Sequence, residues 1–354
     1  MTTTETVEAP TLLEPVATVR GDDEQDARSR RHPLRRRLVT YALALFVLMN
    51  LNFLLPRALP GDPIGALFSG ASPTYVYEEQ TRTELVRYYG LDGSLAEQYG
   101  HYLAALARGD LGVSIRETAP VRDLLLARFP WTALLVGIGM VLAAAVGLAA
   151  GAHSAWHRGR AVDRRLLASF LVVSHLPTYL LASLALLVFA VKLRWLPLSG
   201  GRTPFMASSG LLDQVADIAR HLALPALVMT TSFIFFQYLV MRGSMVSELG
   251  SDYLLGGKAK GLSERRLKYR YAARNAMLPV VTAQALQLRV AVGAAIFIEQ
   301  VFAYPGVGLL LINAVNGRDY PLMQGAFLVL MFAVLTANLA LDLVYERLDP
   351  RSAV

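Results

Sequence analysis

The segment that decides the fold is DYLLGGKAKGLSERR at residues 252–266, continued by RNAMLP at residues 274–279. It is charged and broken by glycines, and it lies between two long apolar runs. An ionised side chain in the middle of a bilayer costs a few kcal/mol, so a membrane-spanning helix does not carry this much charge. The segment therefore predicts an ordered loop with a helix–turn–helix rhythm, held at a membrane face between two spanning helices.

The composition agrees with a membrane protein. Apolar residues make up 54% of the chain and charged residues 17%, whereas soluble domains average about 25% charged residues. The net charge is +7, and the Lys and Arg residues cluster beside apolar runs, which is typical of inner loops facing anionic lipid. We therefore expect membrane lipid as a partner and not nucleic acid. The absence of cysteine excludes a disulfide scaffold, a zinc knuckle and a thiolate nucleophile.

Six apolar runs are long enough to cross a bilayer, which takes about 20 helical residues. They fall near Leu38–Pro56, Trp131–Gly151, Leu166–Val191, Leu222–Met241, Pro279–Phe302 and Leu322–Tyr345. Basic residues in short loops stay on the inner side of the membrane. Residues 30–37, 157–165 and 242–274 are the three basic segments, and with six spans they share one side with both termini. The sequence predicts an all-α, polytopic, multi-pass membrane protein with both termini cytoplasmic.

This reading divides the chain into five segments. They are a disordered cytoplasmic tail (1–30), a first transmembrane helix with a basic collar (31–58), an extracytoplasmic insert (59–128), a five-helix core (129–346) that contains the charged loop (243–278), and a cytoplasmic tail (347–354). Helical apolar spacing over residues 82–89 and 98–106 predicts that the insert is small and α-rich.

Short motifs in a fixed order support a more specific interpretation. They are LPGDP at 59–63, YGLD at 89–92, GDLGVS at 109–114, RFPWT at 128–132, LPLSGG at 196–201, HLALP at 221–225, EQVFAYPGVG at 299–308, RDYPLMQG at 318–325 and DPR at 349–351. Together they resemble the B-type permease subunit of dipeptide, oligopeptide and nickel-class ABC importers, a binding-protein-dependent transport system inner membrane component. The charged loop resembles the cytoplasmic EAA loop of these permeases.

The resemblance implies a type I-like permease in the bacterial cytoplasmic (inner) membrane that forms half of a translocation pathway. It also implies a second related permease, two cytoplasmic ABC ATPase subunits and an extracytoplasmic substrate-binding protein as partners, with no cofactor. Short peptides are the expected substrate, and nickel, an opine or a metallophore is the alternative. The chain has no phosphate-binding G-x-x-x-x-G-K-[ST] loop, so ATP hydrolysis is assigned to partners and no catalytic residue is expected.

By the same resemblance, the charged loop is the ATPase-docking site. We expect a short surface helix around Ala259–Arg266, with a tight turn at Gly261 because only glycine takes a positive φ freely. The residues assigned to docking are Ala259, Lys260, Gly261, Leu262, Ser263, Glu264, Arg265 and Arg266. The alternative is an ordinary basic inner loop.

The loop departs from the family at one point. Members often have RTARAKG where this chain has LGGKAKG at residues 255–261. Each extra glycine costs roughly 1 kcal/mol in a helix interior, which leaves the length of the first loop helix open.

Two polar residues within the spans are candidates for the pathway or a gate. Glu299 lies near the outer end of a span, where it could gate or brace the structure, or cap the helix end against the turn that follows. His175 replaces a small apolar residue expected before Pro177, which should kink the helix. His175 could line the pathway or bond between helices.

Other polar and small residues have structural interpretations. His153 and His157 have the i, i+4 spacing of metal ligands but lack the intervening Glu of a metalloprotease, and no metal site is expected. Gly147 and Gly151 form a pair that permits close helix packing. Carboxylates in Pro/Gly turns are expected to cap backbone amides, namely Asp62, Asp110 and Asp319.

Two other classes of function remain as alternatives. An intramembrane enzyme would need converging polar residues, and only the isolated His175 and Glu299 are present. A secondary transporter would need an inverted repeat with broken helices, which is not evident in the sequence.

Overall fold

The computed structural model describes residues 33–58, 64, 79–204 and 210–348, and every described element is helical or a turn apart from one isolated bridge between Val113 and Pro120. The predicted tails and the LPGDP motif with Asp62 lie outside these residues. The chain forms two compact units, Met1–Val47 and Leu48–Val354. Within the described part of the first unit lies only the start of α2 (Pro33–Ala58), a helix that continues into the second unit.

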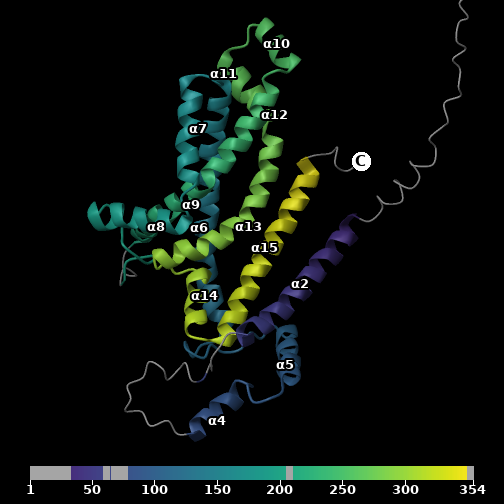
Figure 1. Ribbon diagram of the computed structural model, residues 1–354, viewed down its shortest axis with the longest axis vertical. Coiled ribbons are helices and arrows are strands. Elements are labelled where there is room, and N and C mark those ends of the chain that lie inside the picture. Colours follow the sequence, from purple (N-terminus) through teal and green to yellow (C-terminus); the bar gives the residue numbers. More distant parts are fainter. Residues whose placement is uncertain (1–32, 59–63, 65–78, 205–209, 349–354) are drawn as a thin grey trace, which may run out of the picture. The chain divides into compact units, whose positions relative to one another are not determined.

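The second unit contains the remaining helices (Figure 1). In chain order they are α4 (Glu79–Tyr88), α5 (Leu95–Ala107), α6 (Val121–Trp156), α7 (Ala161–Ser174), α8 (Thr178–Ala185), the π-helix η1 (Leu186–Lys192), α9 (Leu211–Glu248), α10 (Asp252–Ala259), α11 (Glu264–Arg266), the π-helix η3 (Leu267–Ala272), α12 (Ala273–Asn275), α13 (Met277–Val301), α14 (Val307–Asn316) and α15 (Tyr320–Leu348).

Among the residues that the structure describes, five helices are long and apolar enough to cross a membrane, and they match five of the six predicted spans. The third predicted span, Leu166–Val191, is not a continuous helix as expected. It is divided into α7 and α8–η1, which meet at an angle of 97°. Pro177 causes the break, because a proline has no N–H to donate and it disfavours helical geometry in the residue before it. The predicted kink is therefore confirmed, although the change of direction is close to a right angle.

The insert has the two helices that the apolar spacing predicted, α4 and α5. Ser94 begins α5 with a capping box, in which the Glu97 amide donates to the Ser94 hydroxyl and the Ser94 amide donates to the Glu97 carboxylate. The bond from the Ser94 amide holds the pKa of Glu97 below its ordinary value. Asp110 accepts a bond from the Gly112 amide at 2.9 Å, which confirms its predicted role in a turn.

The core of the second unit is the pairing of α6 with α9, which is close because α6 presents glycines to α9. A methyl group added at Gly147 would lie 2.7 Å from the Cβ of Gln237, and one at Gly151 would lie 2.6 Å from the carbonyl oxygen of Tyr238. Both distances are too short for any side chain. The close packing predicted for these two glycines is confirmed, and α13 packs against the same pair of helices.

Candidate functional site

The charged loop folds as a hairpin of short helices, α10 to α12, at one end of the bundle, and α14 lies at the other end (Figure 1). α10 ends at Ala259 in a Schellman motif, in which the amide of Leu262 donates to the carbonyl of Gly257 at 3.1 Å and the amide of Gly261 donates to that of Lys258 at 2.9 Å. Gly261 has a φ of +73°. The predicted turn at Gly261 is therefore confirmed.

The predicted helix around Ala259–Arg266 is wrong in its boundaries. One helix ends at Ala259 and the next begins at Glu264, so the positive φ of Gly261 divides the predicted element. The glycines at 256 and 257 lie inside α10 and do not interrupt it. Gly257 lies against the buried Leu267, because a Cβ at residue 257 would lie 2.6 Å from Cδ2 of that side chain and displace it.

The hairpin is fixed to the ends of α6 and α9 by an apolar cluster. Leu254 and Leu267 from the hairpin pack with Met241 and Met245 from α9 and with Ala155 from α6. This cluster makes the inner side of the hairpin part of the bundle core. A displacement of the hairpin is therefore carried directly to α6 and α9.

The hairpin also carries a buried cation on its inner side. The ammonium of Lys268, whose residue is 6% exposed, lies 3.0 Å from Nδ1 of His153, and the rings of His153 and His157 are 4.5 Å apart. A metal ion would be repelled by this ammonium group. Among the described residues, no group of three His, Asp or Glu side chains could hold a metal.

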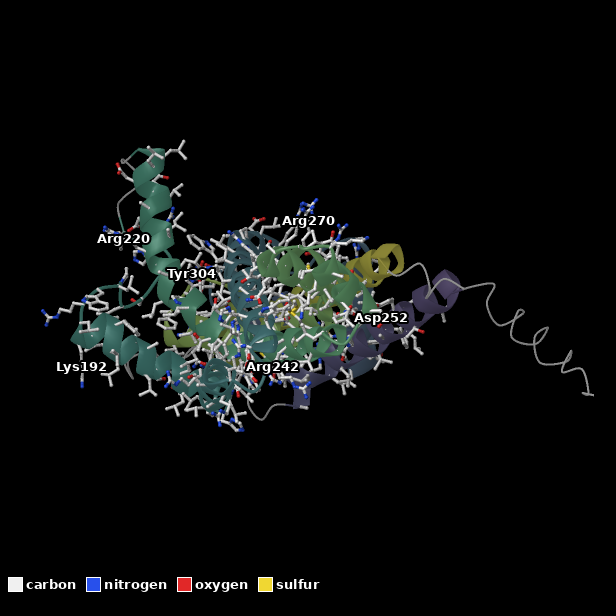
Figure 2. All side chains as sticks on the ribbon, turned by 90° about the horizontal axis from the view of Figure 1, so that it is seen from above. Lys192, Arg220, Arg242, Asp252, Arg270 and Tyr304 are labelled. Atoms are coloured by element: carbon white, nitrogen blue, oxygen red, sulfur yellow. The ribbon has the colours of Figure 1, made fainter. Side chains whose placement is uncertain are left out.

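The outer side of the hairpin is basic. Between residues 252 and 274, six Lys and Arg residues are exposed, against two acidic residues, Asp252 and Glu264. The six basic residues are Lys258, Lys260, Arg265, Arg266, Arg270 and Arg274. Arg270 is labelled in Figure 2. Leu255, at 62% exposure, adds an apolar contact among these charges. Such a surface fits a partner groove with an acidic rim and an apolar floor.

Glu299 lies at the opposite end of the bundle and is fully buried. Its carboxylate accepts a bond from the Thr132 hydroxyl at 2.7 Å and one from the Leu309 amide at 3.0 Å. The Thr132 hydroxyl accepts from the Val307 amide at 2.8 Å. These bonds join α6, α13 and the start of α14, where a carboxylate is also favoured by the helix dipole.

The backbone around Glu299 leaves no room for other side chains. A Cβ at Gly306 would lie 2.2 Å from the carboxylate oxygen Oε1, and one at Gly308 would lie 2.8 Å from Oε2. Of the roles considered for Glu299, this geometry supports bracing and the capping of the helix that follows.

His175 lies in the break between α7 and α8 and is exposed. Its Nδ1 contacts the carbonyl oxygen of Leu171 at 2.7 Å, within the same helix. The alternative of a bond between helices is not observed for this side chain. A place for His175 along the pathway stays a prediction.

Sequence reasoning missed a polar cluster in which Ser154, Asp163 and Tyr238 are buried and Arg242 is partly exposed. It lies where the ends of α6, α7 and α9 meet. Asp163 and Arg242 are 79 residues apart in the chain, and Arg242 was counted among the basic residues that set topology. The available signal was an aspartate four residues after Gly159. The carboxylate of Asp163 accepts a hydrogen bond from the Gly159 amide at 2.9 Å.

The fold defines the class of protein: an all-α polytopic membrane protein with a hairpin of short helices at one end of its core. The chain belongs to the family of binding-protein-dependent transport system inner membrane components, whose sequence profile matches residues 133–354. It is a permease subunit of an ABC importer, and therefore a transport subunit rather than an enzyme. The family resemblance found in the sequence is confirmed.

Named relatives match nearly the whole chain. A protein of Brucella suis biovar 1 (strain 1330) named as a peptide permease is 39% identical over 92% of this chain and 99% of its own length. A protein of Sinorhizobium fredii (strain NBRC 101917 / NGR234) named as a peptide ABC transporter permease is 32% identical over 89% of this chain and 97% of its own. The glutathione transport system permease protein GsiC of Escherichia coli K12 is 34% identical over 89% and 96%.

Proposed function

We propose that this permease subunit imports short peptides, and that the hairpin of residues 251–275 docks onto a cytoplasmic ATPase subunit. The observation that carries the docking role is the two-sided character of the hairpin. Its inner side is locked into the core through Leu254, Gly257 and Leu267, and its outer side is exposed and basic. A loop that served only to set topology would not need an apolar inner side.

The substrate class rests on the relatives. Proteins named for peptide and glutathione transport match this chain over most of their length, which favours a peptide over nickel, an opine or a metallophore. Glutathione is itself a tripeptide, so the two names describe one chemical class.

The proposed complex contains a second related permease, two ATPases and an extracytoplasmic binding protein. ATP binding brings the ATPases together, and the hairpin passes their movement to α6 and α9 as a rigid-body displacement that alternates access between the two faces. Glu299 braces the outer end of the core during this movement. The orientation follows from the basic segments: the hairpin and both termini face the cytoplasm, and residues 59–128 face out.

Uptake by the reconstituted complex tests the substrate. Proteoliposomes that contain the permease pair and ATPases are given the binding protein, ATP and radiolabelled glutathione or trialanine, with nickel ions as the competing substrate. We expect ATP-dependent accumulation of peptide. Accumulation of nickel without peptide would refute the proposed substrate.

Cysteine labelling tests the orientation, because the chain has no cysteine of its own. Ser94→Cys in the insert and Ser263→Cys in the hairpin are both at exposed positions. An impermeant thiol reagent added outside should label the first and not the second. The reverse pattern would refute the orientation.

A further inference from the structure

The polar cluster at the junction of α6, α7 and α9 joins three helices through one carboxylate. Asp163 is 3% exposed and lies in the first turn of α7. Arg242 on α9 donates to it in a fork, from Nε to Oδ1 at 2.7 Å and from Nη2 to Oδ2 at 2.8 Å. The Ser154 hydroxyl at the end of α6 donates to Oδ1 at 2.5 Å. Bidentate, charge-assisted bonds of this kind fix both distance and orientation.

The direction of the bonds within the cluster is determined. Ser154 has one hydroxyl hydrogen, and an ionised carboxylate can only accept, so that hydrogen is donated to Asp163. The 2.6 Å contact between Ser154 and the Tyr238 hydroxyl is then a donation from Tyr238. α9 therefore reaches Asp163 twice, directly through Arg242 and indirectly through Tyr238 and Ser154.

The fully buried contact of α7 with the rest of the bundle lies in this cluster. Asp163 is the one buried residue of α7, all of whose residues the structure describes. Its large apolar side chains include the exposed Val162, Leu171 and Val172, while the ring of Phe170 contacts that of Tyr238 at 4.9 Å between centroids. α7 is thus held at its first turn by a fully buried carboxylate, while its apolar stripe of Leu166, Leu167, Phe170 and Val173 is only half-buried.

The other side of the cluster leads to the docking hairpin. Arg242 is next to Met241, which packs with Leu254 and Leu267 of the hairpin. α9 continues without interruption from Tyr238 to Glu248, after which the hairpin begins. Figure 2 labels Arg242 on α9 and Asp252 and Arg270 on the hairpin. In the opposite direction, α7 leads to the break at Pro177 and then to α8.

We propose that Asp163 and Arg242 are a positioning pair that makes α7, and with it the break before α8, follow the end of α9 when the hairpin is displaced. The proposal rests on the docking role of the hairpin proposed above. The pair transfers the movement of α9 into α7 and α8. None of the described residues of these two helices belongs to the apolar cluster that fixes the hairpin to α6 and α9. Without the pair, the hairpin would still move α6 and α9, but α7 would follow only through its half-buried apolar contacts.

Spin-label distances test the proposal in the whole complex, starting from the natural cysteine-free chain. Val172→Cys on α7 and Ser247→Cys on α9 are at exposed positions outside the cluster. The distance between labels is measured without nucleotide and with a non-hydrolysable ATP analogue. In the otherwise unchanged complex we expect one narrow distribution in both states. In Asp163→Asn or Arg242→Lys we expect the distribution to broaden or to shift with nucleotide.

Transport per ATP is measured on the same variants without labels. Asp163→Asn should lower the peptide taken up per ATP hydrolysed by about tenfold, as expected for loss of a charge-assisted bond worth more than about 1.4 kcal/mol. ATP hydrolysis and copurification of the ATPases should stay near their normal levels. Arg165→Lys, at an exposed position on the same helix, is the matched control and should change nothing.

Two results would overturn the proposal. One is a narrow, nucleotide-independent distance with normal uptake per ATP in both variants. The other is failure of both variants to assemble while the control assembles, because the pair would then hold the fold together. If the unchanged complex takes up neither glutathione nor trialanine, the proposed substrate fails, while the label distances still decide the role of the pair.

Discussion

Three glycines within six residues of the hairpin should respond differently to the same substitution, alanine. Gly261 has a φ of +73° and nothing within 4 Å of an added Cβ, so the cost of Gly261→Ala is backbone strain alone. An L-residue in the left-handed region costs roughly 1–2 kcal/mol. This should reduce the population of the closed turn by about 5- to 30-fold.

The other two glycines, Gly256 and Gly257, lie inside α10, and only the first serves as a control. Gly256 has helical geometry and also has nothing within 4 Å, so Gly256→Ala should stabilise α10 by about 0.5–1 kcal/mol. A Cβ at Gly257 would lie 2.6 Å from the end of the Leu267 side chain, so Gly257→Ala must displace that side chain. We expect Gly257→Ala to loosen the contact between hairpin and core.

Amide hydrogen exchange on the permease in nanodiscs measures these effects without the ATPases. The reporter is the amide of Leu262, whose bond to the carbonyl of Gly257 closes the turn. Exchange at this amide should become about 5- to 30-fold faster in Gly261→Ala and slower or unchanged in Gly256→Ala. Equal exchange rates in these two variants would refute the assignment of strain to Gly261.

Four further substitutions, one of them a control, test contacts within the bundle. Gly151→Leu should prevent α6 and α9 from pairing, because a Cβ at residue 151 would lie 2.6 Å from the backbone of α9. Fluorescence-detected size exclusion should then show loss of the monodisperse protein. Gly137→Leu is the control and should leave the protein monodisperse, because nothing lies within 4 Å of a Cβ there. Glu299→Gln replaces a buried carboxylate that accepts two hydrogen bonds by a neutral amide. The free energy of unfolding should fall by about 1–3 kcal/mol, and the unfolding temperature should fall with it. An unchanged unfolding temperature would contradict the bracing role. Lys268→Met keeps the buried stem and removes the charge, so the unfolding temperature should stay equal or rise, and a large fall would mean that the contact with His153 is stabilising.

The sequence was sufficient for features that the bilayer or a single residue imposes. Five spans could be read from apolar runs, because lipid allows little else over about 20 residues. The turn at Gly261 and the close packing at Gly147 and Gly151 could be predicted because glycine has few other reasons to occupy those positions.

Other features depend on residues that are distant in the chain. Pro177 predicted a kink, but the 97° angle between α7 and α8 depends on the packing of these helices against the rest of the bundle. The bond between Thr132 and Glu299 spans 167 residues, and no local pattern reports it. Arg242 looked like one more basic residue beside a span, and only the arrangement of three helices reveals Asp163 as its partner.

The separation of Asp163 and Arg242 also has a consequence for biogenesis. The two are 79 residues apart, so at about 5–20 residues per second the ribosome needs roughly 4–16 s to make Arg242 after Asp163. During that interval α7 exists with its carboxylate unpaired by α9, and an ionised group resists entry into hydrocarbon. The start of α7 can therefore take its final position against α9 only after Arg242 has been synthesised. The fork between Asp163 and Arg242 is thus a late contact in the assembly of the bundle.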